Sequence, residues 1–407
     1  MSCDTPRRAN YSVAMARTLA IIALALLGGT QLLGQSISRA AHHDYRVVTY
    51  VDALVQPWSI AFLPDGDTLI TERPGRLRIV RNGKLLPNAV EGVPAAVHSG
   101  QGGLLEVAPH PNFASNRLLY LTYSKKTGEP ADPKQPVPAT TALIRGRFEN
   151  DRLTDVQQLF QSVSQGRGHF GGKIAFDKHG FVFLSLGDRQ VAPEGNLAAH
   201  PAQDLTNHHG KMIRLHDDGK VPADNPFVGL AGAKAEIWSY GHRNIQGLAI
   251  HPETGEVWTN EHGPQGGDEL NLTKPGANYG WPVIGFGVNY QTGLAIHAGT
   301  HKEGMQQPAH IWVPSIGISG LMIYTGDRFP MWKGNFFVGG LASHNVVRLT
   351  DDAKRGFTSP EILASECGRI RDVRQGLDGY IYLLTEDRAG KPTPVLRMEP
   401  VERQTSK

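Results

Sequence analysis

Residues 236–281 read EIWSYGHRNIQGLAIHPETGEVWTNEHGPQGGDELNLTKPGANYGW. The stretch opens with a strand-like run at Glu236–Tyr240, followed by a bend at Gly241–Asn244. Two further strands flank a turn at Pro252–Gly255, and a Gly/Pro-rich loop follows at Gly263–Gly267. Loops that present charged side chains between rigid strands commonly carry function. The carbonyls of such a loop, together with carboxylates, are also ligands that calcium accepts.

The hairpin inside this stretch recurs along the chain as a strand, a turn rich in Pro, Asp and Gly, and a second strand. Clear copies lie at 59–72, 172–185, 247–261 and 372–386, and looser copies lie at 105–123 and 321–338. Their spacing of roughly 45 to 80 residues is typical of propeller blades with inserted loops. Six copies predict an all-β fold, a six-bladed β-propeller of four-stranded antiparallel blades. Unrelated hairpins in a sandwich would not explain the shared pattern.

Composition agrees with this prediction. The chain has 407 residues, and its 47 Gly and 27 Pro favour a fold with many turns. Because no low-complexity linker divides the chain, we expect one propeller domain over residues 41–400 and a tail at 401–407. The net charge is +3 without a dense Lys/Arg cluster, so nucleic acid is not expected as a partner.

Residues 1–40 are predicted to hold a signal peptide and a disordered N-terminus. Arg7, Arg8 and Arg17 precede the apolar run Leu19–Leu27, which is short for a membrane-spanning helix. This pattern predicts export to a periplasm, with no membrane attachment after cleavage. An uncleaved membrane anchor is the alternative.

The cysteines and one histidine group add little to this picture. Of the two cysteines, Cys3 falls inside the predicted signal, so Cys367 would be alone in the mature chain and no internal disulfide is possible. An exported protein of this kind suits a bacterial periplasm. His208, His209 and His216 could suggest zinc, but their spacing is not a recognised one, and a polar hairpin is the preferred interpretation.

Residues suited to acid–base and anion chemistry lie just before predicted blade strands. His169 stands between glycines, where an accessible imidazole can take a proton from a hydroxyl. Arg243 follows a tight bend, while Arg369 and Arg371 alternate at a strand start and point the same way. Three arginines near one channel mouth would suit an anionic ligand with several carboxylates.

His169, Arg371 and the nearby candidate Gln101 also have simpler, structural interpretations. With 17 histidines in the chain, any single one is more often structural. Arg371 could form a local pair with Asp372 or Glu366, and Gln101 could belong to a plain glycine-rich turn. No GxGxxG follows a strand into a helix, so a nicotinamide Rossmann site is unsupported, and no GxSxG, HExxH or paired CxxC occurs.

Taken together, the motifs resemble those of the soluble, periplasmic PQQ-dependent aldose sugar dehydrogenases, relatives of soluble quinoprotein glucose dehydrogenase. The resemblance extends from Leu54 to Asp387. It is carried by Gly100–Leu104, Gly168–Gly172, Gly210–Leu215 with Asp224–Phe227, Gly241–Asn244, Glu261–Pro264 with Gly267–Glu269, Asn278–Trp281 and Arg369–Asp372. Any one of these segments alone would be a weak signal, but their combination is specific.

The resemblance implies a six-bladed propeller that holds pyrroloquinoline quinone (PQQ) and calcium over its channel. It implies oxidation of aldose sugars at the anomeric carbon to lactones. His169 would act as the general base on the anomeric hydroxyl while hydride moves to the quinone C5. Arg243 would stabilise the charge that develops on a quinone oxygen.

The resemblance also implies the ligands of the cofactor and of calcium. Gly263 and Pro264 would offer carbonyls to the calcium that polarises the cofactor as a Lewis acid. Glu269 and Tyr279 would bind a second, structural calcium. The residues that would surround the cofactor are Gln101, His169, Arg243, Asn244, His262, Gly263, Pro264, Asp268, Tyr290, Ser319, Arg369 and Arg371.

The chain departs from the glucose dehydrogenase relatives at two of these places. Gly168 stands where they carry an Asp before the catalytic His, so the group that orients His169 is left open. Ala342 stands where they carry a Lys for the cofactor.

Two other functions stay open beside the dehydrogenase. One is a non-catalytic, calcium-stabilised propeller that binds a sugar or a protein partner, since fold does not fix function. A hydrolytic lactonase ranks last, because the acidic residues cluster in one loop. The dehydrogenase would require an aldose substrate and an electron acceptor that the sequence does not identify, and would act as a monomer or homodimer.

Overall fold

The computed structural model describes residues 36–402 except 131, 133 and 353–355. The predicted signal at the N-terminus lies almost wholly outside these residues, as does most of the predicted tail. Within the described part of the chain, no helix is long and apolar enough to cross a membrane. Helices are short there, namely α1 (Phe113–Asn116) and the 3-10 turns η1 (Leu197–Ala199), η2 (Pro201–Gln203) and η3 (Pro330–Trp332).

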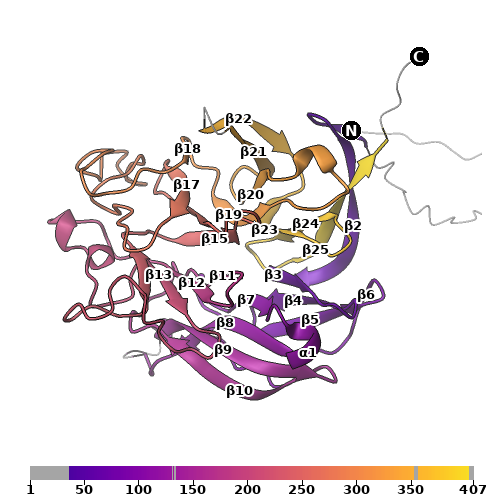
Figure 1. Ribbon diagram of the computed structural model, residues 1–407, viewed down its shortest axis with the longest axis horizontal. Helices are drawn as coiled ribbons and strands as arrows, with labels where there is room; N and C mark the ends of the chain where they lie inside the picture. Colours follow the sequence, from indigo (N-terminus) through magenta and orange to yellow (C-terminus); the bar gives the residue numbers. More distant parts are fainter. Residues whose placement is uncertain (1–35, 131, 133, 353–355, 403–407) are drawn as a thin grey trace, which may run out of the picture. The chain divides into compact units, whose positions relative to one another are not determined.

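Six antiparallel sheets make up the described body, and they are arranged around a common centre (Figure 1). The first three, each from its inner strand outward, are β3 (Pro57–Phe62), β4 (Thr68–Glu72), β5 (Arg76–Arg81) and β6 (Lys84–Leu85); β7 (Leu104–Pro109), β8 (Leu118–Lys126), β9 (Ala139–Glu149) and β10 (Arg152–Gln161); and β11 (Ile174–Phe176), β12 (Val182–Leu186), β13 (Lys211–Leu215) and β14 (Ile237–Tyr240).

The other three sheets complete the ring. They are β15 (Ile245–Ile250), β16 (Val257–Glu261), β17 (Asp268–Thr273) and β18 (His310–Trp312); β19 (Ile318–Ile323), β20 (Phe336–Gly340), β21 (Val346–Asp352) and β22 (Gly356–Leu363); and β23 (Arg369–Gln375), β24 (Ile381–Glu386), β25 (Pro392–Val401), β2 (Asp44–Val55) and β1 (Ser38–Arg39). Each inner strand (β3, β7, β11, β15, β19 and β23) contacts the inner strand of the next sheet, and β23 contacts β3. The six-bladed propeller is therefore confirmed, and each repeated hairpin of the sequence is the first pair of strands of one blade.

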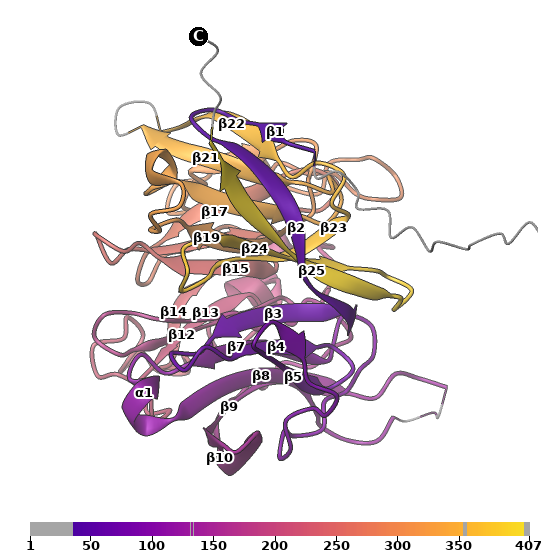
Figure 2. The ribbon, with the colours of Figure 1, turned by 90° about the vertical axis from the view of Figure 1, so that its right-hand side faces the viewer.

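One blade differs from the predicted four strands. Near its end the chain forms β25, and β2 from its beginning pairs antiparallel with it, for example Val47 with Met398 (Figure 2). The short strand β1 then pairs with β2. This blade has five strands, so the prediction of four strands is wrong for it, because a two-residue strand leaves no hydrophobic pattern in the sequence.

The core lies between neighbouring blades. Successive side chains of a strand point to opposite faces, and both faces of a blade strand are covered. In β8, Leu119 packs with Leu69 of β4 in one cluster, while Tyr120 packs with Val182 and Leu184 of β12 in another. This is why the middle strands read as nearly continuous apolar runs.

Candidate active site

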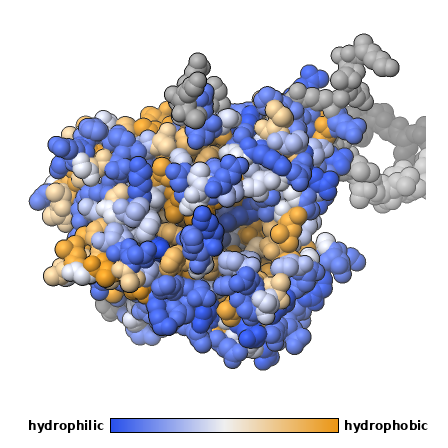
Figure 3. Space-filling view, viewed as in Figure 1, coloured by the Kyte–Doolittle hydropathy of each residue, from blue (hydrophilic) through white to orange (hydrophobic). Residues whose placement is uncertain are grey.

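A cavity of about 880 Å³ lies at the end of the propeller where the six inner strands begin. It lies on the face opposite the one that carries α1; Figure 3 is viewed from the α1 face, so the cavity is on the side that this view does not show. Each of the six inner strands has a cavity-lining residue at or just before its start; these are Gln56, Gln101, His169, Asn244, Gly317 and Arg369. The candidate residues, distant in sequence, are thus brought together by the ring itself.

Most of the cofactor-contacting residues predicted from the sequence line this cavity. They are Gln101, His169, Arg243, Asn244, His262, Gly263, Pro264, Asp268, Tyr290, Arg369 and Arg371. Tyr290 stands at the rim with 65% of its surface exposed. Ser319 is not among the lining residues, because it is buried between two inner strands and its Oγ donates to the Ile370 carbonyl at 2.7 Å.

A buried carboxylate orients His169. Nδ1 of His169 lies 2.6 Å from Oδ1 of Asp188, while Oδ2 of Asp188 accepts the Trp281 indole N–H at 2.7 Å. An ionised carboxylate can only accept, so Nδ1 carries the hydrogen and Nε2 is left to accept a proton. Asp188 therefore performs the orienting role that Gly168, as a glycine, cannot. Sequence reasoning missed it, although a carboxylate just after the buried strand β12 was a usable signal.

The electrostatics of the pair suit a base. Burial lowers the pKa of His169 below its ordinary value; the Asp188 carboxylate opposes this, and the charge of Arg243 lowers it further. Burial acts to raise the pKa of Asp188, but the charge and hydrogen bond of His169 outweigh it, so the net shift is downward. A neutral imidazole next to a carboxylate anion is the result near neutral pH.

The backbone of His169 is held as firmly as its ring. His169 has a φ of 47°, a left-handed value that is uncommon for a side chain of this size. Its N–H donates to Gln101 Oε1 at 2.7 Å, and its carbonyl accepts from the buried Arg189 at 2.5 Å. A Cβ on Gly187 would lie 2.2 Å from that carbonyl, which accounts for the glycine there.

Arg243 joins the two loops of the organising stretch. Its Nη1 donates to the Gly263 carbonyl at 2.9 Å, and its guanidinium carbon lies 5.2 Å from the Trp281 ring centroid. Its Nε is buried and has no hydrogen-bond partner among the described residues. Burial, followed by the charge of Arg243, holds the pKa of His262 well below its ordinary value. The imidazoles of His169 and His262 thus both stay neutral near Arg243.

Arg369 and Arg371 point the same way, as predicted, but their partner is different. Both bind Glu386 at the end of β24: Arg369 Nη2 lies 2.9 Å from Oε1, and Arg371 Nε lies 2.9 Å from Oε2. Burial would raise the pKa of Glu386, but the charges of the arginines, that of Arg371 first, lower it to about 2. The predicted alternative of a local pair with Asp372 or Glu366 is therefore wrong.

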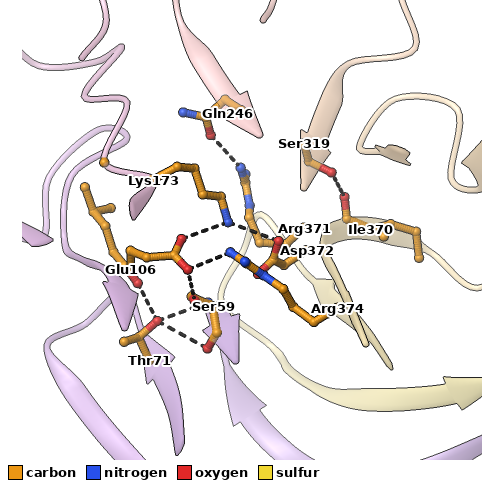
Figure 4. Close-up of polar contacts among 12 residues, drawn as sticks. Ser59, Thr71, Glu106, Lys173, Gln246, Ser319, Ile370, Arg371, Asp372 and Arg374 are labelled. Atoms are coloured by element: carbon orange, nitrogen blue, oxygen red, sulfur yellow. Dashed lines mark hydrogen bonds and ion pairs between the residues drawn. The ribbon is translucent and has the colours of Figure 1, made fainter. Parts of the chain in front are cut away.

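Asp372 belongs instead to a buried ion network in the channel (Figure 4). Lys173 Nζ lies 3.1 Å from Glu106 Oε2 and 3.0 Å from Asp372 Oδ1. Arg374 contacts the same two carboxylates at 2.6 and 2.9 Å, and Ser59 Oγ donates to Glu106 at 2.8 Å. These residues come from the inner strands of four blades or the segment just before them. Sequence reasoning did not predict this network, because nothing local marks residues on different blades as partners.

The loop Gly263–Gly267 and the Asp268 and Glu269 that follow it contain the carbonyl and carboxylate oxygens predicted for calcium. The Gly263 carbonyl accepts from Arg243, and the Pro264 carbonyl accepts from Ser315 Oγ at 3.4 Å. Asp268 accepts three backbone N–H groups, those of Gly263, Gly317 and Ile318. Burial is the main cause that raises the pKa of Asp268.

The two residues predicted for a second calcium, Glu269 and Tyr279, line a small cavity of about 20 Å³ beside this loop. Burial, then the charge of the neighbouring Glu261, raises the pKa of Glu269 to about 8. The Tyr279 hydroxyl donates to the Leu272 carbonyl at 2.6 Å and accepts from the Lys274 N–H at 2.8 Å. In the described residues no group of three or more His, Cys, Asp or Glu could hold a metal.

The fold is a six-bladed propeller, and its cavity is lined by several arginines and by the carboxylate-bound His169. The family model for glucose/sorbosone dehydrogenase matches residues 54–397. The aldose sugar dehydrogenase YliI of Escherichia coli is 41% identical over 360 residues, which cover 86% of this chain and 93% of the relative. The chain therefore belongs to the glucose/sorbosone dehydrogenase family, and the resemblance seen in its motifs is confirmed.

Two further relatives place the chain within that family. Quinoprotein glucose dehydrogenase B of Acinetobacter calcoaceticus is 29% identical over 362 residues, covering 83% of this chain and 72% of the relative. The structure of the PQQ-bound form of aldose sugar dehydrogenase from Streptomyces coelicolor aligns with a TM-score of 0.69 at 26% identity, covering 87% of this chain and 98% of the other. The protein is accordingly an enzyme of the aldose and glucose dehydrogenase type.

Proposed function

We propose that this enzyme oxidises aldose sugars at the anomeric carbon to lactones, with PQQ as the electron-accepting cofactor and calcium as its metal. The observation that carries the proposal is the His169–Asp188 pair. It presents a neutral, oriented base at a cavity that also contains Arg243, Arg369 and Arg371. A base facing several cations suits removal of a proton from a hydroxyl while negative charge develops nearby.

The residues present fit a planar quinone with three carboxylates. Arg369 and Arg371 share a single carboxylate, Glu386, so their five-donor guanidinium groups retain capacity for an anion. Arg243 has a buried Nε without a partner among the described residues, and the carbonyls of Gly263 and Pro264 are oxygen ligands of the type that calcium prefers. When bound, the quinone would take up the hydride that leaves the anomeric carbon, with calcium making it more electrophilic.

The chain's own residues would perform the proton chemistry. Nε2 of His169 would take the proton of the anomeric hydroxyl, and Asp188 would stabilise the imidazolium that forms and hold its orientation. Arg243 would stabilise negative charge on the oxygen that it faces. Gln101, Asn244, His262, Asp268 and Tyr290 would surround the cofactor, a role for which Ser319 is less suited because its Oγ is engaged elsewhere.

The structural calcium, the location, the oligomeric state and the electron acceptor are proposed from the resemblance to the family. Glu269 and Tyr279 would hold a structural calcium, Tyr279 through its backbone carbonyl because its hydroxyl already has two partners. The N-terminal signal would direct the enzyme to the periplasm. There it would act as a monomer or homodimer and pass electrons to a separate acceptor.

The test is reconstitution of the purified protein with PQQ and calcium, followed by dye reduction with a panel of aldoses. We expect sugar-dependent reduction that requires both additions and falls by at least roughly a hundredfold in His169→Ala. The matched control is His179→Ala, which removes an exposed histidine in the turn after β11. Calcium binding with no PQQ uptake and no reduction on any sugar would leave the non-catalytic propeller as the function.

A further inference from the structure

Arg73 lines the cavity but belongs to none of the residues predicted from the sequence. It directly follows β4, and its Nη2 donates to the Gly100 carbonyl at 2.6 Å and to the Gly102 carbonyl at 3.2 Å. Its Nε donates to the Gly102 carbonyl at 3.3 Å. These bonds leave Nη1 available. Within the described part of the chain, Arg73 forms no ion pair with a carboxylate.

The charges around Arg73 are out of balance. Burial lowers the pKa of Arg73, and the positive charge of Arg371 lowers it further, against the weaker effect of Glu386. Glu386 cannot serve as its counter-ion, because both of its oxygens accept from Arg369 and Arg371. Arg369 and Arg371 therefore share Glu386, and Arg73 beside them has no carboxylate partner among the described residues. Cations withdrawn from water without a partner are costly unless a ligand supplies the negative charge.

The position of Arg73 is fixed by its backbone. Its N–H donates to the Gln56 carbonyl at 3.1 Å, and its own carbonyl accepts the Leu104 N–H at 3.1 Å. Arg73 is thereby held between the starts of β3 and β7, two of the inner strands. Its guanidinium is held by the bonds of Nε and Nη2 to the Gly100 and Gly102 carbonyls, so it can meet a ligand without a large loss of side-chain freedom.

We propose that Arg73 and Arg371 form a carboxylate-binding subsite on this wall of the cavity. The carboxylate belongs either to the cofactor, in which case the inference rests on the proposed function, or to an acidic sugar such as a uronate. A guanidinium matches a carboxylate through two parallel hydrogen bonds, which a lysine in the same place could not reproduce.

Arg73 also has a structural role, because it holds the loop that contains Gln101. Its bonds to Gly100 and Gly102 hold the loop of Gln101, and Gln101 Oε1 accepts from the His169 N–H. If Arg73 served only to hold this loop, its loss would disturb His169 and lower kcat while ligand affinity stayed the same. If Arg73 binds a carboxylate, affinity itself must change, and the change must depend on ionic strength.

The experiment compares wild type with Arg73→Gln and Arg73→Lys, and uses Arg145→Gln as the matched control. Arg145 also donates to a backbone carbonyl, that of Asp217, but does not line the cavity. The first probe is trimesate, a planar tricarboxylate without redox chemistry, titrated calorimetrically into the protein at low and moderate salt. We expect Arg73→Gln to weaken trimesate binding by roughly ten- to a hundredfold, Arg73→Lys to weaken it less, and the control to leave it unchanged.

Two further measurements identify the source of the carboxylate. If PQQ binding, followed by fluorescence, weakens in parallel in Arg73→Gln, the subsite takes a cofactor carboxylate. If PQQ binding is unchanged while KM rises for glucuronate and not for glucose, the subsite takes the carboxylate of an acidic sugar. Unchanged affinity for all three ligands, with or without a lower kcat, would overturn the proposal and leave Arg73 as a loop contact.

Failure of the proposed function would look different. A wild-type protein that binds trimesate through Arg73, yet takes up no PQQ and oxidises no sugar, would retain the carboxylate subsite and lose the dehydrogenase assignment.

Discussion

At the scale of single residues, the chemistry depends on how Asp188 and Trp281 fix one imidazole. The carboxylate accepts from Nδ1 of His169 with one oxygen and from the Trp281 indole with the other. This fixes the tautomer and leaves Nε2 as the only ring nitrogen that can accept a proton. Burial then keeps the ring neutral at a pH where a free histidine would already be partly charged.

A pH profile tests this arrangement. A base acts in its neutral form, so activity is present above the pKa of His169 and is lost as pH falls through it. Because burial lowers this pKa below the ordinary 6.5, the acidic limb of kcat/KM should lie below pH 6.5. Asp188→Asn removes a charge that raises the pKa of His169, so the limb should move to still lower pH, while the rate falls by roughly a hundredfold or more.

The control for this variant is Asp155→Asn, which removes an exposed carboxylate of β10. It should change neither the limb nor the rate. An acidic limb that moves upward in Asp188→Asn, or a rate that does not change, would show that Asp188 is not the partner of the base.

Single residues also show where sequence reasoning succeeded and where it stopped. His169 and Arg243 could be singled out because each lies in a loop before a repeated strand. Asp188 follows the second strand of the hairpin that His169 precedes, and Glu386 ends the second strand of the hairpin that contains Arg371. They were not assigned as partners, because the repeat pattern marks the hairpin but not which side chains meet across it. Local spacing suggested Asp372 for Arg371, but successive residues of a strand point to opposite sides, so Asp372 faces the channel network instead.

At the scale of the strands, the hairpin pattern was enough to predict six blades, but not how their inner strands are joined. Lys173, just before β11, contacts Glu106 of β7 and Asp372 of β23. Arg374 of β23 contacts the same two carboxylates. The network links the segments that also carry His169 and Arg371, so it holds two sides of the active site at a fixed separation.

Removal of one member should expose the dependence of the strands on this network. Lys173→Met keeps much of the side-chain volume and removes the charge, leaving Glu106 and Asp372 with one cation between them. Breaking a buried ion pair by removing one partner costs about 3–5 kcal/mol. Urea unfolding should therefore show a loss of this order. The exposed Lys178→Met, in the turn after β11, should stay within about 0.5 kcal/mol of wild type. A loss below about 1 kcal/mol in Lys173→Met would mean that the network contributes little to joining the strands.

At the scale of the propeller, the ring is closed by pairing β2 with β25. The two strands lie near opposite ends of the chain and share a long antiparallel register, from Asp44 with Val401 to Val55 with Pro392. Val51 and Leu54 of β2 are buried in the cluster that also contains Leu384 and Val395. Without β2, β25 would become an exposed edge strand, and such edges promote association with other chains.

Two truncations test this closure. A variant that lacks residues 1–35 keeps every described strand and should unfold with the midpoint of the parent. A variant that lacks residues 1–55 loses β1 and β2, and with them the buried Tyr45, Val51 and Leu54. Each of these side chains contributes about 1.5–3 kcal/mol through burial, so the midpoint should fall by roughly 10 °C or more, with self-association visible by size-exclusion chromatography. Equal midpoints for the two variants would mean that the other five blades hold the ring without its closing strand, and would place the stability of the active site in the inner strands alone.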